Sequence, residues 1–181
     1  MDHDALLGSL QQAIPGVGFE PAPSVDRHAV VYVPVADLHE TLRLLRDRSD
    51  LAFGFLAELT AVDFWPREPR FEVAYVLVSF AQRHRLRVKV RLAGPDPRVP
   101  TVTDLWPAAN WLEREVWDLF GIVFDGHPDP RRLLMPEDWE GYPLRKDYPV
   151  QIRKKANSVE PLQVTEEEFR RNLEKDRLLR R

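Results

Sequence analysis

The chain has 181 residues and a mass of 21.1 kDa, a length that predicts one domain with at most an appended tail. It contains no cysteine, which excludes disulfide scaffolds, thiol nucleophiles, cysteine-ligated zinc and thiolate-held iron–sulfur clusters. Twenty-six Lys and Arg against 29 Asp and Glu give a formal net charge of −3, which argues against a general affinity for nucleic-acid phosphates. The acidic N-terminal stretch lacks the features of a secretory signal, and no apolar run approaches the ~20 residues of a membrane helix. We therefore expect any membrane contact to be indirect.

The first part of the chain is predicted to contain two helices separated by a strand. Residues 4–12 have the composition of a short helix, and the β-branched run at residues 29–35 is typical of a strand. Asp37 followed by Glu40 resembles a capping box. A helix is predicted after it from apolar residues at helical spacing, Leu38, Leu42 and Leu45.

The next part is predicted to contain a third helix and two strands. The helix is predicted from apolar residues three and four apart, Leu51, Phe55, Leu59 and Val62. Residues 71–80 are typical of a buried strand, and in residues 85–92 apolar and basic residues alternate strictly, as in a strand with one exposed face. Only a short link separates these strands, so an antiparallel hairpin is predicted. The fold class is α+β: a single domain with helices packed on a mainly antiparallel sheet.

The last third changes character. Residues 107–121 predict an amphipathic helix that Gly121 ends, and with it the α+β domain of residues 1–121. Residues 122–152 have no lasting periodicity but many prolines and aromatic rings, which predicts a long irregular arm. The arm could dock on a partner or wrap its own domain, and the sequence leaves these alternatives equal. Residues 153–181 predict a charged helical tail, with Thr165 as a cap before Phe169 and Leu173.

Two groups of side chains raise the question of catalysis or nucleic-acid binding. Asp125, His127 and Asp129 have the residue types of an open metal site, but the prolines between them favour a turn. The basic residues of 85–92 could follow a nucleic acid, but no aromatic side chains alternate with them, so a solubilising role is favoured. This basic stripe consists of Arg85, Arg87, Lys89 and Arg91. No glycine-rich phosphate loop or hydrolase motif is present.

The predicted helix at 107–121 carries several charges whose roles can be anticipated. Glu115 lies at the edge of its apolar stripe, where an ion pair with a basic residue of the arm is favoured over a general base with a raised pKa. Arg114 and Asp118 are four residues apart and are expected to pair on the exposed face. The basic residues of the arm that could pair with Glu115 are Arg131, Arg132, Arg145 and Lys146.

Residues 101–150 closely resemble the signature of the 30-kDa, or C-type, subunit of respiratory complex I, the proton-pumping NADH:quinone oxidoreductase. The residues before them fit the family in layout, including 55–64, whereas the N-terminus and the tail carry little family signal. In some relatives this subunit is fused to the D-type subunit, and because the chain stops at Arg181 we expect a separate polypeptide. The matching motifs are Glu113-Arg114-Glu115, Trp117-Asp118, Phe120-Gly121-Ile122, Gly126-His127-Pro128, Arg131-Arg132 and Pro143-Leu144-Arg145-Lys146-Asp147-Tyr148-Pro149.

The resemblance implies a non-catalytic scaffold subunit of the peripheral arm of complex I. Such a subunit holds no flavin, iron–sulfur cluster or metal; FMN and the clusters lie in partner subunits, and electrons pass from NADH to quinone through them. Its main partner is the quinone-site, D-type subunit, and its place is the cytoplasmic face of the bacterial cell membrane, where it is peripheral. The residues that the resemblance marks as interface candidates are Glu113, Arg114, Glu115, Trp117, Asp118, His127, Arg131, Arg132, Trp139, Arg145, Lys146, Asp147 and Tyr148.

Three alternatives stand beside this interpretation. The chain could be the equivalent subunit of a membrane-bound hydrogenase or of a dehydrogenase with another electron donor. It could be an independent metal hydrolase that uses Asp125, His127 and Asp129. It could also be a nucleic-acid module that binds through its basic stripe.

Overall fold

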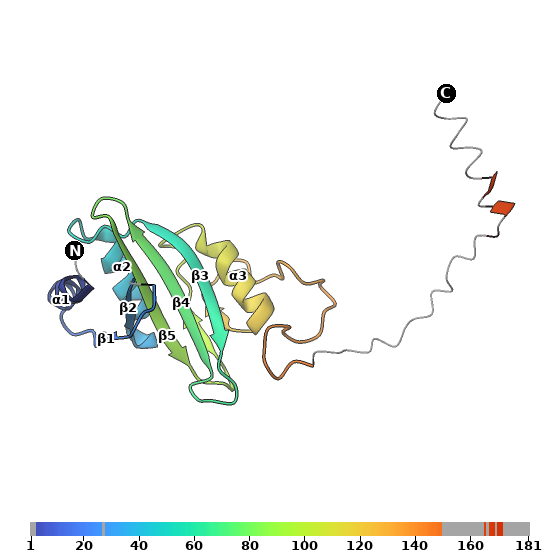
Figure 1. Cartoon of the computed structure of the whole chain (residues 1–181), viewed down its shortest axis with the longest axis horizontal. Helices are drawn as coiled ribbons and strands as arrows, with labels where there is room; N and C mark the ends of the chain where they lie inside the picture. The colour runs from blue at the N-terminus through green and yellow to red at the C-terminus, as the bar shows by residue number, and fades with distance from the viewer. Residues whose placement is uncertain (1–2, 27, 150–164, 166, 169, 172–181) are drawn as a thin grey trace, which may run out of the picture. The chain divides into compact units, whose positions relative to one another are not determined.

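The computed structural model describes residues 3–26, 28–149, 165, 167–168 and 170–171 (Figure 1). The chain divides into two units, residues 1–148 and residues 149–181. Within the described residues, no helix has the length and apolar character needed to cross a membrane. The elements in chain order are α1 (His3–Ala13), β1 (Glu20–Pro21), β2 (Ala29–Tyr32), a 3-10 helix η1 (Val35–Asp37), α2 (Leu38–Asp47), β3 (Phe55–Asp63), β4 (Phe71–Ser79), β5 (His84–Leu92), β6 (Arg98–Pro100), α3 (Ala109–Phe120) and β7 (Val123–Asp125).

A five-stranded sheet forms the centre of the first unit, in the order β1-β2-β5-β4-β3. Strands β4 and β5 pair antiparallel from Phe71↔Leu92 to Ser79↔His84, which confirms the predicted hairpin. Strand β2 pairs with β5 in parallel, a contact that the sequence did not predict. The fold class is confirmed: the domain is α+β, and its sheet is mainly antiparallel.

Helix α2 covers one face of this sheet, the face turned away from the viewer in Figure 1. Its apolar residues Leu38, Leu42 and Leu45 are all 0% exposed, as their helical spacing predicts. The start of this helix differs from the prediction. Asp37 is the N-cap but its side chain makes no capping hydrogen bond, and Glu40 instead pairs with Arg43, three residues later, at 2.6 Å.

The prediction of a third helix is wrong, because residues 55–63 form strand β3. Leu56, Leu59 and Ala61 are buried, whereas Phe55 is 47% exposed. The pairing of β3 with β4 shifts register between Leu56 and Glu58, which marks a β-bulge. The bulge changes which face of the sheet the following residues occupy, so the alternation of buried and exposed residues is interrupted. Apolar residues of the strand then lie three or four positions apart, as in a helix.

Helix α3 lies beside β3 at the edge of the sheet (Figure 1). It connects β6 to β7, which pair in parallel, so these three elements form a small βαβ unit that the sequence did not indicate. Gly121 ends the helix with φ 71°, as predicted from its position.

The arm and the tail were predicted as separate segments of residues 122–152 and 153–181, and this division stays a prediction. Thr165 accepts a hydrogen bond from the backbone N–H of Glu168 at 3.3 Å, as expected of a helix cap. Phe169 and Leu173, predicted in the same helix, lie outside the described residues.

Candidate functional site

The described arm, residues 122–148, lies along α3 and is fixed to it by side chains of the helix. The contacts follow one another in order: Arg114 holds residues 131–132, Asp118 holds residues 132–135, and the C-terminal end of the helix meets residues 144–145. The described part of the arm therefore wraps its own domain, and docking of the arm on a partner stays a prediction.

Arg114 makes the first contact. Its guanidinium donates to the carbonyl oxygens of Arg131 at 3.0 Å and Arg132 at 3.1 Å, and it lies 3.5 Å from the Asp129 carboxylate. Only 8% of Arg114 is exposed, because the arm covers the helix face that the charge pattern predicted to be exposed. The predicted pair between Arg114 and Asp118 is therefore wrong, and each residue binds the arm instead.

Asp118 makes the second contact and is 0% exposed. Its Oδ2 accepts from the backbone N–H groups of residues 133, 134 and 135 at 3.0, 2.7 and 2.8 Å, and its Oδ1 accepts from Arg132 at 2.7 Å. Burial alone would raise the pKa of Asp118, but these donors together lower it. The carboxylate is thus a buried anion around which the arm's backbone turns.

Arg145 makes the third contact, at the C-terminal end of α3. It donates to the carbonyl oxygens of Phe120 at 2.5 Å and Gly121 at 3.3 Å, where the helix dipole favours a cation. Its guanidinium lies 4.6 Å from the ring centre of Tyr142. Partial burial lowers its pKa from the ordinary value.

The close packing at this end predicts a specific sensitivity at Gly121. A Cβ there would lie 2.6 Å from Arg145 Nη2 and against the Tyr142 ring, and φ is +71°. We expect Gly121→Ala to lower the free energy of unfolding by about 2 kcal/mol, since both strain and overpacking oppose it. Gly8→Ala, where nothing lies within 4 Å of the added Cβ, should instead raise it by about 0.5 kcal/mol. Urea denaturation of both variants measures the difference; equal effects would contradict the packing described.

A second set of charges ties the end of the arm to the sheet. Arg70 donates to Asp63 at 3.0 and 2.8 Å and to Asp147 of the arm at 3.0 and 2.6 Å. Asp63 also accepts from the backbone N–H groups of Trp65 and Lys146, both at 2.9 Å. Burial works against ionisation of Asp63, but Arg70 and these N–H groups outweigh it and lower its pKa to about 2.

Asp63 and Arg70 were not singled out from the sequence. A signal was present, because Asp63 interrupts the apolar stretch of 59–64 and an isolated acid in a buried strand needs a partner. Its partner Arg70 is near in the chain, but the second acid that Arg70 binds, Asp147, lies 77 positions after Arg70, a separation that no local pattern can predict.

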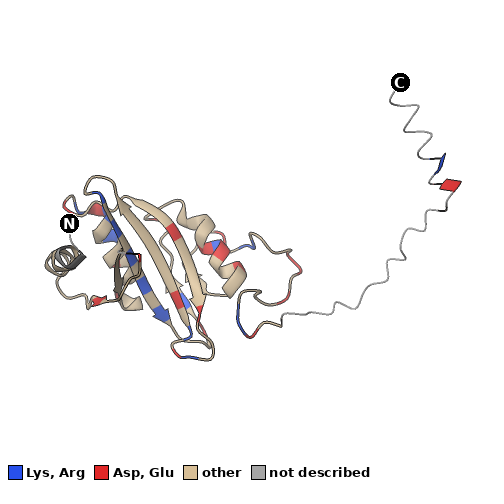
Figure 2. Cartoon of the chain, viewed as in Figure 1, with Lys and Arg blue, Asp and Glu red and all other residues tan. Residues whose placement is uncertain are grey.

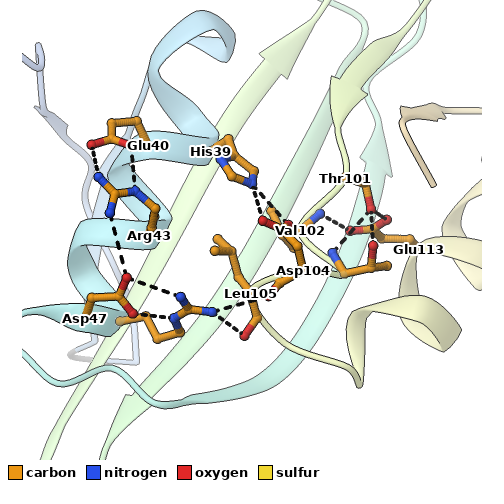
Figure 3. A network of polar contacts seen from close by, with 11 residues as sticks. His39, Glu40, Arg43, Asp47, Thr101, Val102, Asp104, Leu105 and Glu113 are labelled. Atoms are coloured by element: carbon orange, nitrogen blue, oxygen red, sulfur yellow. Dashed lines mark hydrogen bonds and ion pairs between the residues drawn. The ribbon is translucent and has the colours of Figure 1, made fainter. Parts of the chain in front are cut away.

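Glu113 anchors the other side of α3 (Figure 3). It is 0% exposed, accepts from Thr101 Oγ1 at 2.5 Å and from the Val102 N–H at 2.7 Å, and so holds the loop that precedes the helix. The same loop reaches α2, because Asp104 lies 3.0 Å from His39. Burial raises the pKa of Glu113 to about 7, although both hydrogen bonds work in the opposite direction.

The raised pKa of Glu113 predicts a dependence of stability on pH. Because the folded pKa lies above its ordinary value of 4.5, the contribution of Glu113 is full below pH 4.5 and is lost as the pH rises to about 7 and beyond. In Glu113→Gln this loss is absent, so the variant should gain about 3 kcal/mol relative to the parent between pH 4.5 and pH 8. Denaturant titrations at several pH values measure it. Glu115→Gln is the matched control and should show no such trend.

Glu115 was the carboxylate expected to pair with the arm, and this prediction is wrong. Its side chain is only half-buried and has no ion pair within the described part of the chain. The buried carboxylates of α3 are Glu113 and Asp118, because the helix is covered on two sides, by the loop at 101–102 and by the arm. An apolar stripe identifies only one buried face, so the second was missed.

Asp125 is the last residue of β7, and His127 follows in a turn, its backbone N–H donating to the Phe124 carbonyl oxygen at 3.2 Å. Asp125 pairs with Arg98, and Asp129 pairs with Arg131 at 2.6 Å. His127 Nδ1 accepts from the Asp129 N–H at 3.0 Å, and its Nε2 lies 3.1 Å from the Asn110 carbonyl oxygen. In the part of the chain that the structure describes, no group of three or more His, Cys, Asp or Glu could hold a metal ion.

The remaining predicted interface residues also have places in the arm or beside it. Trp139 and Tyr148 stack with ring centres 6.4 Å apart, and the Arg132 guanidinium lies 5.7 Å from the Trp117 ring centre and donates to the Trp139 carbonyl oxygen at 2.7 Å. Lys146 and Arg131 are exposed. The structure thus brings the predicted set together on α3 and the arm; their part in an interface between subunits stays a prediction.

Comparison with known proteins gives one consistent result. The model of the family described as respiratory-chain NADH dehydrogenase, 30 Kd subunit, matches residues 31–154. The C subunit of NADH-quinone oxidoreductase from Roseiflexus castenholzii is 47% identical over 150 residues, which are 83% of this chain and 86% of that protein. The C/D subunit of NADH-quinone oxidoreductase from Methylococcus capsulatus is 39% identical over 171 residues, which are 91% of this chain and 28% of that protein.

Solved structures agree. The trypsin-resistant fragment of Nqo5 is similar with a TM-score of 0.58 and 38% identity, over 71% of this chain and 99% of the fragment. A chain of the membrane-bound sulfane sulfur reductase, an archaeal respiratory membrane complex, is similar with a TM-score of 0.70 and 28% identity. That similarity covers 83% of this chain and 87% of the archaeal one.

Proposed function

Since the chain belongs to the 30-kDa subunit family of the respiratory-chain NADH dehydrogenase, we propose that it is a non-catalytic scaffold subunit in the peripheral arm of complex I. In this role it supports electron transfer from NADH to quinone through FMN and iron–sulfur clusters that its partner subunits hold. The chain contributes fixed geometry to that path, because electron transfer and quinone chemistry both depend on the positions of the reacting groups.

This proposal rests on the structural role of the charged residues of α3. Glu113, Arg114 and Asp118, which lie in the motifs shared with the family, are buried and bonded to loop and arm backbone. Their polar atoms hold the polypeptide in place through these hydrogen bonds. This arrangement is typical of residues that fix the shape of a protein surface, here the surface formed by α3 and the arm.

The surface so shaped offers apolar side chains to a partner. Trp111 on α3 and Leu134 and Leu144 on the arm are 57%, 59% and 51% exposed, although the backbone beneath the two leucines is fixed by Asp118 and by the helix end. Large apolar and aromatic side chains on a rigid support are typical of protein interfaces. Among the predicted interface residues, the exposed Arg131 and Lys146 then contribute at its rim, and the buried ones contribute by positioning the arm.

The partner that we assign to this surface is a D-type subunit, the 49-kDa type. Relatives named as C/D subunits support this assignment, since a similar chain there forms part of a longer polypeptide. Complex I is a membrane assembly, and we assign this chain to its cytoplasmic side as a peripheral component that reaches the membrane only through its partners.

One related alternative has a specific observation in its favour. The archaeal sulfane sulfur reductase chain has the same fold, so the module also serves in a respiratory complex with another name. The equivalent subunit of a hydrogenase or other-donor dehydrogenase would use α3 and the arm in the same way. The electron-donor subunits of the complex distinguish these alternatives.

Copurification tests the proposal. The tagged chain is isolated from detergent-solubilised membranes of its host, and the bound polypeptides are identified by mass spectrometry. We expect a D-type subunit together with flavin- and NADH-binding subunits. A nickel-site subunit in their place would support the hydrogenase alternative, whereas a chain that elutes alone, with enzymatic turnover of its own, would overturn the proposal.

A further inference from the structure

No described helix covers the second face of the five-stranded sheet, the face toward the viewer in Figure 1. The strand register arranges its side chains in rows across β3, β4 and β5. One row, at the end of the sheet next to the β4–β5 turn, contains Phe55, Val78 and Arg85. Phe80 follows in the turn and packs on Phe55 with ring centres 5.7 Å apart. We name these four residues the sheet-end patch.

The basic stripe on β5 lies on this face, and its strand is visible in Figure 2. Three of its four residues are paired with acids of the same chain, whereas Arg85 has no ion pair within residues 3–26 and 28–149. Arg83, in the turn beside it, is exposed and likewise has none there. The three internal pairs are Arg87–Asp26 at 2.7 Å, Lys89–Glu72 at 2.6 Å and Arg91–Glu20 at 2.9 Å.

The apolar part of the patch lies where the charge is uncompensated. Phe80 is 72% exposed and Phe55 is 47% exposed, and Val78, which pairs with Phe55 across the strands, is half-buried. Phe55 on β3 and Phe80 in the adjoining turn are in contact, and together they offer more apolar area than scattered surface residues do. The paired cations Lys89 and Arg91, further along β5, lie instead against the half-buried Tyr32 ring, at 5.7 and 3.6 Å from its centre.

We propose that the sheet-end patch is a second docking surface, whose occupant is a segment of a neighbouring protein subunit with an apolar side chain beside a carboxylate. The apolar side chain packs on Phe55 and Phe80, and the carboxylate pairs with Arg85 and Arg83. Charge complementarity selects an acidic occupant, because acids among the described residues pair with the rest of the stripe but not with Arg85 or Arg83. An anionic membrane is a poorer fit, since stable attraction to lipid takes clusters of about four to eight basic residues.

This surface is distinct from the one on α3 and the arm. The arm is tied to Asp63 at one end of β3, and Phe55 is at the other end of that strand, roughly 26 Å away for eight steps of about 3.3 Å. The chain can therefore contact two neighbours at once. A second docking surface goes beyond the proposed function, and its absence would leave that function intact.

Site-specific photocrosslinking in the assembled complex tests for this occupant. Phe80 is replaced by p-benzoylphenylalanine, a change that its exposure tolerates, and the crosslinked peptide is identified by mass spectrometry. We expect a peptide of another subunit with Asp or Glu within a few residues of the crosslinked position. Crosslinks to lipid, to a peptide without an acid nearby, or to nothing while other subunits copurify would overturn the second docking surface and leave the proposed function standing. A chain that copurifies with no subunit would overturn both.

A charge reversal provides the second measurement. Arg85→Glu should lower the crosslink yield by about tenfold, since reversing one member of a close charge pair turns attraction into repulsion. The matched control is Arg67→Glu, an exposed arginine in the β3–β4 turn that also has no ion pair among the described residues, and its yield should be unchanged. Equal yields for the two reversals would show that Arg85 contributes nothing and would contradict the assigned occupant.

Discussion

Replacing Asp118 by Ala is expected to lower the free energy of unfolding by about 3–5 kcal/mol and to release the arm from α3. The change removes the acceptor of three backbone N–H groups and leaves Arg132, whose side chain is 16% exposed, without its carboxylate. Breaking a buried pair by removing one partner costs this much because the other charge stays buried and uncompensated.

Amide hydrogen exchange shows which part of the chain Asp118→Ala destabilises. The amides of residues 133–135 should exchange much faster than in the parent, whereas those of β4 should keep their order of protection. Asp138→Ala is the matched control, because Asp138 is an exposed carboxylate of the same arm and its loss should cost less than about 0.5 kcal/mol. Unchanged protection at 133–135 would refute the role given to Asp118.

Replacing Arg70 by Met is the second change with a large expected effect, again about 3–5 kcal/mol of unfolding free energy. Met keeps much of the side-chain volume but removes both charge-assisted contacts, to Asp63 and to Asp147. Asp63, with 1% of its side chain exposed, keeps only two backbone donors. Asp147→Asn is the milder control, since that carboxylate is 44% exposed and its pair with Arg70 is partly screened.

The Arg70 effect should depend on pH in a defined direction. The pKa of Asp63 is lowered from 3.8 to about 2, so its stabilising contribution is present above pH 3.8 and is lost as the pH falls to about 2. The difference in unfolding free energy between the parent and Arg70→Met should therefore shrink by about 2 kcal/mol as the pH falls over that range. Denaturant titrations between pH 2 and pH 5 measure it, and a difference that grows toward low pH would contradict the assignment.

The spacing of apolar residues predicted those helices and strands that are buried in the same way along their whole length. Helix α2 and strand β5 each bury one continuous face, so spacing by three and four, or by two, identifies them directly, and β4 is identified by its continuous apolar run. Strand β3 was predicted wrongly because its bulge breaks the alternation halfway along. The parallel contacts β2–β5 and β6–β7 join residues far apart in the chain, and no local pattern carries that information.

The candidate site was located by its motifs, but the roles of its residues were not predictable in the same way. Glu113, Arg114 and Asp118 have the pattern of a charged helix face, and such a face is usually exposed. Here the arm and the loop at 101–102 bring backbone N–H and C=O groups against the helix. These buried groups need hydrogen-bond partners, and the charged side chains of α3 accept from or donate to several of them. Only the three-dimensional structure reveals which backbone segment faces which side chain.

In the proposed function this chain supports electron transfer by position and carries out no chemical step itself. A strain that lacks the chain tests this role, because complexes purified from it can be compared in two activities, NADH oxidation by ferricyanide and NADH oxidation by quinone. We expect quinone reduction to be lost while ferricyanide reduction, which needs only the NADH-oxidising subunits, is largely retained. Full quinone reduction by a complex proven to lack this polypeptide would contradict the positional role.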